Sequence, residues 1–355
     1  MNPATIVTDL AASGDAFYVR MLARAVQRAD AGLRFVRFRP SAMLTGRAPD
    51  VWHMHWPESV ATSRSGTRAA LDVAAYALSL RAARRGDTRI VWTVHNLAPH
   101  ERLQRRSADR LMRNVVERLD GWISLTEAAV PLALDRFPAL ARLPRLVVPH
   151  GHYADVYPPA VERAEARSRL GIAPDARALL YFGNIRPYKN VPGLVRAFRA
   201  VADERAILLV AGAPYDARVQ RDVEAAAAGD ARIRLRLAHV PESEVPLLFG
   251  AADRAVLPAE RILNSGSMVL SLSFGVPALA PSTPVLRELR EQAGAAALTL
   301  FEPPLDAAAL AAFLAQTPPE REPLIQRLRT AHDWNRIGSA TARFYRSVMQ
   351  APRHG

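Results

Sequence analysis

The chain has 355 residues, half of them apolar, and is therefore long enough to bury the cores of two domains of ordinary size. It has no cysteine, which excludes disulfide bonds and thiolate metal sites and fits a reducing cytoplasm. The N-terminus lacks the pattern of a signal peptide, and no apolar run reaches the ~18–20 residues that span a bilayer, so we expect a soluble protein.

The net charge of +13 is distributed unevenly along the chain. Arginines gather before and after one predicted strand, at Arg81, Arg84, Arg85 and Arg89 and again at Arg102, Arg105, Arg106, Arg110 and Arg113. Such a basic face could meet nucleic acid, anionic lipid or phosphorylated substrates. Because no aromatic residues alternate with these arginines to stack on bases, we favour a peripheral membrane contact and expect no nucleic-acid partner.

In the first half of the chain, predicted strands alternate with predicted helices. Apolar runs predict strands at residues 5–10, 33–38, 51–55, 90–94, 121–125 and 146–149, and helical spacing predicts helices at 17–26, 69–83 and 107–118. This alternation predicts a parallel, doubly wound α/β sheet.

Polar side chains gather where three of these strands end. They are His53, His55, Trp56 and Glu58 at the third strand, His95, Asn96, His100 and Glu101 at the fourth, and His150 and His152 at the last. Neighbouring imidazoles can bind a metal ion, but no Asp or Glu joins them in the spacing of zinc motifs, so we expect no metal. Two interpretations stay open for the histidines: they hydrogen-bond a sugar or a diphosphate, or they are buried structural residues.

The strand and helix pattern restarts after Pro158 and Pro159. A helical linker at 160–170 leads to predicted strands at 178–182, 206–211, 233–237, 254–257 and 277–280, which alternate with helices at 191–202, 219–228, 242–251 and from about 265 onward. The pattern predicts two Rossmann-like halves that meet near residue 155. Since ligands bind at the carboxyl ends of the strands in such sheets, we expect both halves to face a central cleft.

The segment 181–190, YFGNIRPYKN, joins a predicted strand to a predicted helix. Gly183 opens the turn, and the loop then carries Arg186 and Lys189, the only lysine in the chain. Free amides at a helix start and fixed positive charges together favour phosphate oxygens, so the segment predicts a phosphate site. The alternative is that both cations are solvated loop charges.

A second segment, Asn264-Ser265-Gly266-Ser267, precedes an apolar helix. Ser265 can cap that helix, and Gly266 lets backbone amides approach an anion closely, so the segment predicts a second contact to a diphosphate. A plain helix cap is the alternative. The predicted donor site also includes Ser267, His239, Val240, Glu260 and Asn264.

These residues give the chain a resemblance to GT-B glycosyltransferases of the group 1 (family 4-like) type. The matching features are the spacing from Gly183 to Lys189, the pair Ala252-Asp253, the segment 333–345, and His95, which resembles the histidine that reaches the donor sugar in that family. A closer resemblance is to glycosyltransferase family 94, the β-mannosyltransferases of xanthan-type exopolysaccharide assembly. It rests on six motifs in order: HWPE at 55–58, HNLAPHE at 95–101, HGHY at 150–153, IRPYK at 185–189, NSG at 264–266 and RIG at 336–338.

The resemblance implies an acceptor-binding domain at 1–155, a nucleotide-sugar domain at 156–332 and a helix at 333–355 that returns to the first domain. It implies transfer of mannose from GDP-mannose to a polyprenyl-diphosphate-linked oligosaccharide at the inner face of the cell membrane, without a metal or other cofactor. We then expect His55, Trp56, His95, Asn96, His150 and His152 to contact the acceptor or the sugar.

The sequence departs from the group 1 pattern at one position. Retaining members carry two glutamates with seven residues between them; Glu260 fits the first, but Met268 stands at the second. This favours an inverting reaction, in which a carboxylate takes the acceptor's proton. Glu58 is the first candidate for that base, with Asp15 and Glu101 as alternatives. Three other functions stay open: a transferase with a UDP-linked donor, a nucleotide-sugar epimerase, and a basic nucleic-acid or lipid binder with a vestigial donor site.

Overall fold

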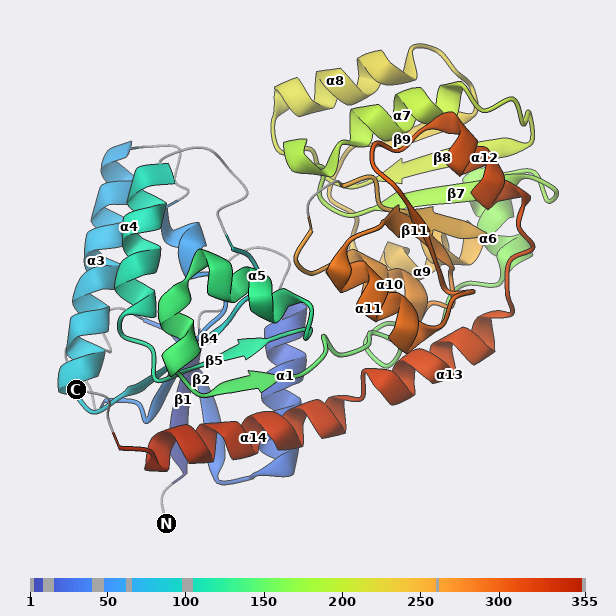
Figure 1. Ribbon diagram of the computed structural model, residues 1–355. Helices are drawn as coiled ribbons and strands as arrows, with labels where there is room; N and C mark the ends of the chain where they lie inside the picture. The colour runs from blue at the N-terminus through green and yellow to red at the C-terminus, as the bar shows by residue number, and fades with distance from the viewer. Residues whose placement is uncertain are drawn as a thin grey trace. The chain divides into compact units, whose positions relative to one another are not determined.

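The computed structural model describes residues 3–8, 16–39, 48–61, 66–97, 105–259 and 262–352. The chain divides into two compact units (Figure 1). The first unit comprises Met1–Gly151 together with Asp333–Gly355, and the second comprises His152–His332. The C-terminal segment therefore belongs to the same unit as the N-terminal part of the chain.

Six parallel strands form the sheet of the first unit, in the order β2-β1-β3-β4-β5-β6. They are β1 (Ala4–Thr8), β2 (Leu33–Arg37), β3 (Val51–Met54), β4 (Arg89–Thr93), β5 (Gly121–Ser124) and β6 (Arg145–Val147). Every residue of β3 and β5 is buried, as expected for strands covered by helices on both faces. The predicted parallel α/β sheet is confirmed for this half of the chain.

Helices cover both faces of this sheet. They are α1 (Ala16–Ala29), α3 (Gly66–Arg85), α4 (Arg105–Val116), α5 (Ala129–Arg136) and α14 (Trp334–Gln350), with short 3₁₀ turns η1 (Pro57–Ala61) and η2 (Pro138–Arg142). Residues of α1 and α14 share one core with Ile6, Val51 and Val91. On the other face, Tyr76 of α3 packs on Trp52, with ring centroids 5.0 Å apart.

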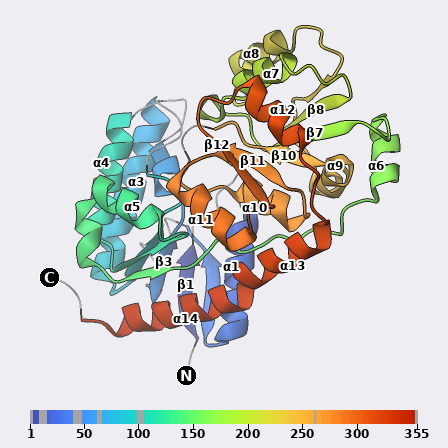
Figure 2. The same ribbon diagram turned by 45° about the vertical axis from the view of Figure 1, so that its right-hand side comes forward.

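The C-terminal helix α14 packs along α1 (Figure 1, Figure 2), so the predicted return of this helix to the first domain is confirmed. A glycine lies at the closest approach: a Cβ on Gly338 would come within 2.4 Å of the backbone of Ala25. Beyond it, Arg346 forms an ion pair with Asp30 at 2.8 Å. Gly338 thus permits a helix contact that a larger residue would prevent.

The second unit contains another parallel sheet of six strands, in the order β12-β11-β10-β7-β8-β9. They are β7 (Arg177–Phe182), β8 (Ala206–Ala211), β9 (Ile233–Arg236), β10 (Arg254–Val256), β11 (Ala278–Pro281) and β12 (Leu298–Phe301). Numbered within the unit, this is the order 3-2-1-4-5-6 of the Rossmann fold in reverse, which confirms the predicted Rossmann-like half.

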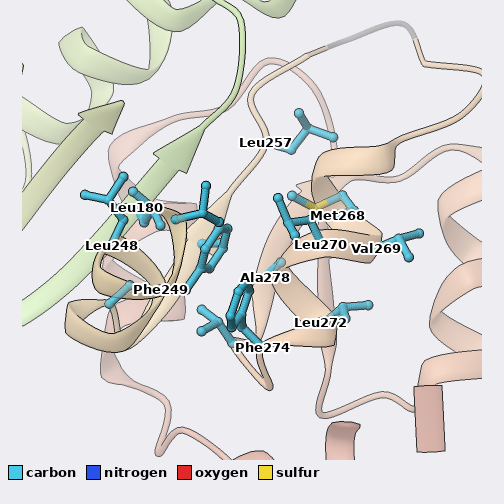
Figure 3. Close-up of a cluster of buried hydrophobic side chains, with 14 of the residues drawn as sticks. Leu180, Leu248, Phe249, Leu257, Met268, Val269, Leu270, Leu272, Phe274 and Ala278 are labelled. Carbon is cyan, nitrogen blue, oxygen red and sulfur yellow. The ribbon is translucent and has the colours of Figure 1, made fainter. Parts of the chain in front are cut away.

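Two hydrophobic cores lie on opposite faces of this second sheet. The helices are α6 (Arg163–Leu170), α7 (Val191–Arg199), α8 (Ala217–Ala227), α9 (Val245–Ala251), α10 (Gly266–Ser273), α11 (Pro284–Ala293), α12 (Ala307–Ala315) and α13 (Arg321–Ala331), with 3₁₀ turns η3 (Pro187–Lys189) and η4 (Glu242–Glu244). One core takes residues of α7, α8 and α12. The other takes residues of α9, α10, α11 and α13, and includes Phe249 stacked on Phe274 at 4.8 Å (Figure 3).

Asp253, the acidic residue of the group 1 pattern, has a structural role at the start of β10. Its carboxylate accepts hydrogen bonds from the buried guanidinium of Arg167 at 2.6 Å and from the backbone N–H of Ala178 at 2.8 Å. These bonds join α6, β7 and β10 at the amino end of the sheet, away from the strand ends where ligands bind.

Across the ranges given above, none of the helices combines the length and the apolar character that crossing a membrane requires.

Candidate active-site residues

In the second unit, the predicted phosphate loop leads from β7 into α7. Gly183 follows the strand with a φ of +123°, a conformation that L side chains rarely adopt. Pro187 then opens the 3₁₀ turn that contains Lys189, and Asn190 adopts a left-handed conformation before α7 begins. The loop therefore turns back over the strand end rather than extending from it.

The second predicted anion segment caps α10. The Oγ of Ser265 accepts a hydrogen bond from the backbone N–H of Met268 at 3.2 Å and lies 3.2 Å from the Oγ of Ser267. A Cβ on Gly183 would lie 3.6 Å from the Nζ of Lys189 and 4.0 Å from the Cβ of Ser267. The structure thus brings the lysine, the glycine turn and the helix start together.

The sheet topology explains why these two segments meet. The strand order of the second unit reverses between β7 and β10, which are hydrogen-bonded neighbours. Open α/β sheets bind ligands at this reversal, outside the carboxyl ends of the strands. Gly183 follows β7 and Ser265 follows β10, so both flank that position. A lysine ammonium, free helix amides and serine hydroxyls there form a suitable site for phosphate oxygens.

The remaining predicted donor residues have varied surroundings. The guanidinium of Arg186 lies over the ring of Tyr215, 4.9 Å from its centroid. His239 is exposed, Val240 is buried in the hydrophobic core, and Asn264 and Gly266 are half-buried. Glu260 lies outside the described residues.

Met268, at the position of the second glutamate of retaining relatives, is 3% exposed. Its side chain lies among core residues that include Leu257 and Leu270 (Figure 3). A carboxylate in this apolar environment would be costly without a partner.

In the first unit, Glu58 lies in η1, which His55 and Trp56 separate from the end of β3. Its side chain is buried, and one carboxylate oxygen, Oε1, accepts a hydrogen bond from the Nδ2 of Asn96 at 3.0 Å. The other oxygen, Oε2, is buried without a hydrogen-bond partner among the described residues. Burial raises the pKa of Glu58 to about 7, although the bond from Asn96 acts in the opposite direction. A carboxyl with this pKa can both accept and release a proton near neutral pH.

Three buried histidines, His53, His55 and His95, lie in β3 or just after the ends of β3 and β4. The Nδ1 of His55 is 3.1 Å from the Nε2 of His95, while His53 bonds to Thr93 and Tyr345. Burial lowers the pKa of His53 to about 3 and holds the pKa values of His55 and His95 well below the usual value. All three imidazoles are therefore neutral at physiological pH and can act as hydrogen-bonding groups rather than as cations.

Aromatic rings enclose the His55–His95 pair. The ring of Tyr18 of α1 makes T-shaped contacts with both imidazoles, with centroid distances of 5.7 Å to His55 and 5.0 Å to His95. Trp56 stacks on His95 at 4.5 Å, and His150 lies 4.8 Å from Tyr18. We call Tyr18, His55, Trp56, His95 and His150 the aromatic cluster. Of its members, Trp56 and His150 are half-buried and the other three are buried.

The sequence did not indicate that Tyr18 belongs to this cluster. The residue lies in the predicted helix 17–26, where its spacing is that of an ordinary core position. The pair His150 and His152 also divides between the two units: the Nε2 of His152 lies 3.8 Å from Asp155, within the second unit.

Two of the candidate bases, Asp15 and Glu101, lie outside the described residues, as does His100. Within the described ranges, no three His, Asp or Glu side chains are grouped so that they could hold a metal ion.

Comparisons with known proteins agree with this architecture. The sequence pattern of the family described as Glycosyl transferases group 1 matches residues 162–329. A GDP-mannose:glycolipid 4-beta-D-mannosyltransferase from Xanthomonas campestris pv. campestris is 34% identical over 307 residues, which cover 85% of this chain and 80% of that protein.

Two solved structures show the same fold. Sucrose-phosphate synthase from Thermosynechococcus elongatus matches with a TM-score of 0.72 and 18% identity, covering 99% of this chain and 100% of that one. The catalytic domain of starch synthase IV from Arabidopsis thaliana, bound to ADP and acarbose, matches with a TM-score of 0.70 and 12% identity, at 99% and 100% coverage. At these identities the likeness concerns the fold alone.

Proposed function

Because the chain belongs to the group 1 glycosyltransferases and has their GT-B fold, we propose that it transfers mannose from GDP-mannose to a lipid-linked oligosaccharide, with inversion to a β-linkage. The observation that carries this proposal is the meeting of Lys189, Gly183 and Ser267 at the strand-order reversal of the second unit. We propose that the diphosphate of the donor binds at this position.

On the donor side, the reaction must stabilise the negative charge of the departing nucleoside diphosphate. The ammonium of Lys189 and the amides at the start of α10 supply fixed positive charge without a metal ion. Arg186 contributes a second cation on the same loop. The choice of guanosine and mannose is supported by the printed activity of the Xanthomonas relative.

On the acceptor side, a hydroxyl group attacks C1 of the sugar and must lose its proton. Glu58 is suited to take that proton because its buried carboxylate has one oxygen held by Asn96 and one without a partner among the described residues. Burial raises the pKa of Glu58 to about 7, close to the working pH of a general base. Trp56, the half-buried ring after His55, offers a surface on which a sugar ring can stack.

The proposal of inversion rests on Met268. A retaining relative would carry a second glutamate at this position, and here the side chain is apolar and buried. The proposal that the acceptor is a glycolipid follows the relative's name. With such an acceptor, the protein would work at the inner face of the cell membrane.

Nucleotide selectivity tests the donor assignment. Thermal unfolding would be followed with GDP, UDP or ADP, first for the natural protein and then for Lys189→Ala. We expect GDP to raise Tm more than UDP or ADP do, and the variant to lose most of that shift, because ligand binding to the folded state stabilises it. A larger Tm shift with UDP would indicate that the donor is UDP-linked and not GDP-mannose. Equal Tm shifts in the natural protein and the variant would show that Lys189 does not belong to the nucleotide site.

A further inference from the structure

Helix α3 carries an apolar stripe on its solvent face. Leu71 and Leu78 are 63% and 51% exposed, more than any other large hydrophobic side chain in the described ranges. They are seven positions apart, so they lie on one face of the helix, and the exposed Ala74 and Ala75 fall between them. We call Leu71, Ala74, Ala75 and Leu78 the α3 stripe.

The packing of the described residues does not need this stripe. The opposite face of α3 packs on the sheet through Ala69, Tyr76, Leu80 and Ala83, all of which are buried. A surface helix that already buries one face ordinarily exposes polar residues on the other. Paired leucines on the outer face therefore indicate an interaction surface.

Unpaired positive charge adjoins the stripe. Arg81 and Arg85 continue the same exposed face of α3, and Arg110 and Arg113 are exposed on the adjacent helix α4 (Figure 1, Figure 2). None of the four forms an ion pair within the part of the chain that the structure describes. The acidic Asp72 of α3 is paired with Arg68 at 3.2 Å, so it does not offset them.

The stripe begins close to the proposed base. The turn η1, which contains Glu58, contacts both α3 and α4. Since α3 runs antiparallel to the strands, Leu71 in its first half lies toward the carboxyl ends of the strands, Leu78 lies just past its middle, and Arg81 and Arg85 lie at the far end.

We propose that α3 lies on the surface of an anionic lipid bilayer, with Leu71 and Leu78 entering the headgroup region and Arg81 and Arg85 contacting lipid phosphates. An apolar stripe beside cations is the pattern by which a helix binds in the plane of a membrane interface. This inference rests on the proposed glycolipid acceptor, whose reacting sugar would lie beside such a surface. The surface brings η1 and Glu58 toward the plane in which that acceptor is anchored.

Vesicle binding without donor or acceptor tests the surface. Flotation would compare vesicles of phosphatidylcholine alone with vesicles containing 30% phosphatidylglycerol, at low and high salt, for the natural protein and two double variants. Leu71→Ser with Leu78→Ser should weaken binding on the order of tenfold or more at every salt concentration, because it removes insertion. Arg81→Gln with Arg85→Gln should weaken binding mainly at low salt, because ions screen charge attraction. Leu132→Ser, at an exposed leucine of α5, is the matched control and should bind normally.

A labelled cysteine gives a second, independent readout. The chain has no cysteine, so Leu78→Cys can be labelled with an environment-sensitive dye at one position only. Anionic vesicles should shift its emission to the blue, and should not affect the same dye at Leu132→Cys. Unchanged emission at position 78, or normal vesicle binding by the double leucine variant, would overturn the proposal.

Two further measurements separate this proposal from its alternatives. Light scattering could show that the natural protein is a dimer and the double leucine variant a monomer, while the variant still binds vesicles. In that case the stripe is a contact between two copies of the chain, and the lipid proposal is wrong. If it loses vesicle binding but transfers normally to a water-soluble, short-chain acceptor, the lipid proposal stands and the transferase proposal is untouched. Failure of the natural protein to transfer mannose to the soluble acceptor would instead contradict the proposed function.

Discussion

The hydroxyl group of Tyr345 lies 2.6 Å from the Nδ1 of His53, so the C-terminal helix is hydrogen-bonded to a strand 292 positions earlier in the chain. The other ring nitrogen of His53, Nε2, lies 2.7 Å from the Oγ1 of Thr93. A neutral imidazole has one donor and one acceptor, so both of its polar atoms are satisfied. This pairing fixes the end of β3, immediately before His55 and Trp56.

Tyr345→Phe should therefore destabilise the first unit. The substitution keeps the ring but leaves a buried nitrogen of His53 without its partner, at a cost of about 1–3 kcal/mol in the free energy of unfolding. Urea unfolding would measure the difference. Thr341→Val on the same helix is the matched control, because the buried Oγ1 of Thr341 has no hydrogen-bond partner among the described residues. The control should be neutral or stabilising; equal costs for both variants would contradict the role given to the Tyr345–His53 bond.

Glu58→Gln should remove the pH dependence that the proposed base imposes. Because the base acts in its ionised form and burial raises its pKa to about 7, kcat/KM of the natural protein should rise with pH through this value. The amide variant should lose on the order of 10²-fold or more in kcat/KM and should lack the rise. A variant that keeps the same pH profile would show that another group is the base.

Glu58 should also make the stability of the protein depend on pH: stability should fall as the pH rises, whereas activity should rise. The folded-state pKa of Glu58, about 7, is raised from the usual value of 4.5. Between these values the folded state holds a proton that the unfolded state has released, so the free energy of unfolding falls as the pH rises, by about 3 kcal/mol in all. Glu58→Gln should not show this loss. Unfolding measured from pH 4.5 to 8 would reveal it as a difference between the two proteins.

Lys189→Ala should lower the rate of transfer while leaving the fold intact. A cation that stabilises the departing diphosphate is worth on the order of 10²-fold in rate, as for other single electrostatic donors, whereas loop cations contribute little to stability. Arg218→Ala is the control, since its side chain is 85% exposed on α8. An unchanged kcat/KM in Lys189→Ala would show that the lysine is only a surface charge and does not assist the reaction.

Activity should survive treatment with EDTA. In the described ranges, no cluster of acidic or histidine side chains is placed to hold Mg²⁺ or Mn²⁺ beside the donor loop, and protein cations take that role in the proposal. Loss of transfer after chelation, restored by a divalent ion, would contradict the proposed charge stabilisation.

The sequence alone could predict the alternation of strands and helices because buried parallel strands appear as short apolar runs. It did not predict α5, where Pro131 lies within the first turn, a position at which the missing N–H is tolerated. It also did not predict α12, whose residues Ala307–Ala315 are apolar on every side and so show no helical period.

The candidate site was only partly predictable, because several of its contacts join distant parts of the chain. The phosphate loop could be identified from Gly183 and Lys189, since both lie in one short segment. The neutral state of His55 and His95 depends on burial beside Tyr18 of α1, a contact that no local pattern reveals. In the same way, the raised pKa of Glu58 depends on its burial beneath the elements around η1.

The most direct test of the proposed function is to identify the product of transfer. Radiolabelled GDP-mannose would be incubated with the protein and a panel of polyprenyl-diphosphate-linked oligosaccharides that differ in their terminal sugar, with UDP-glucose as the competing donor. We predict mannose transfer to one of these acceptors, with a β-anomeric signal in the NMR spectrum of the product. An α-linked product would contradict inversion, and transfer from UDP-glucose in preference to GDP-mannose would contradict the proposed donor.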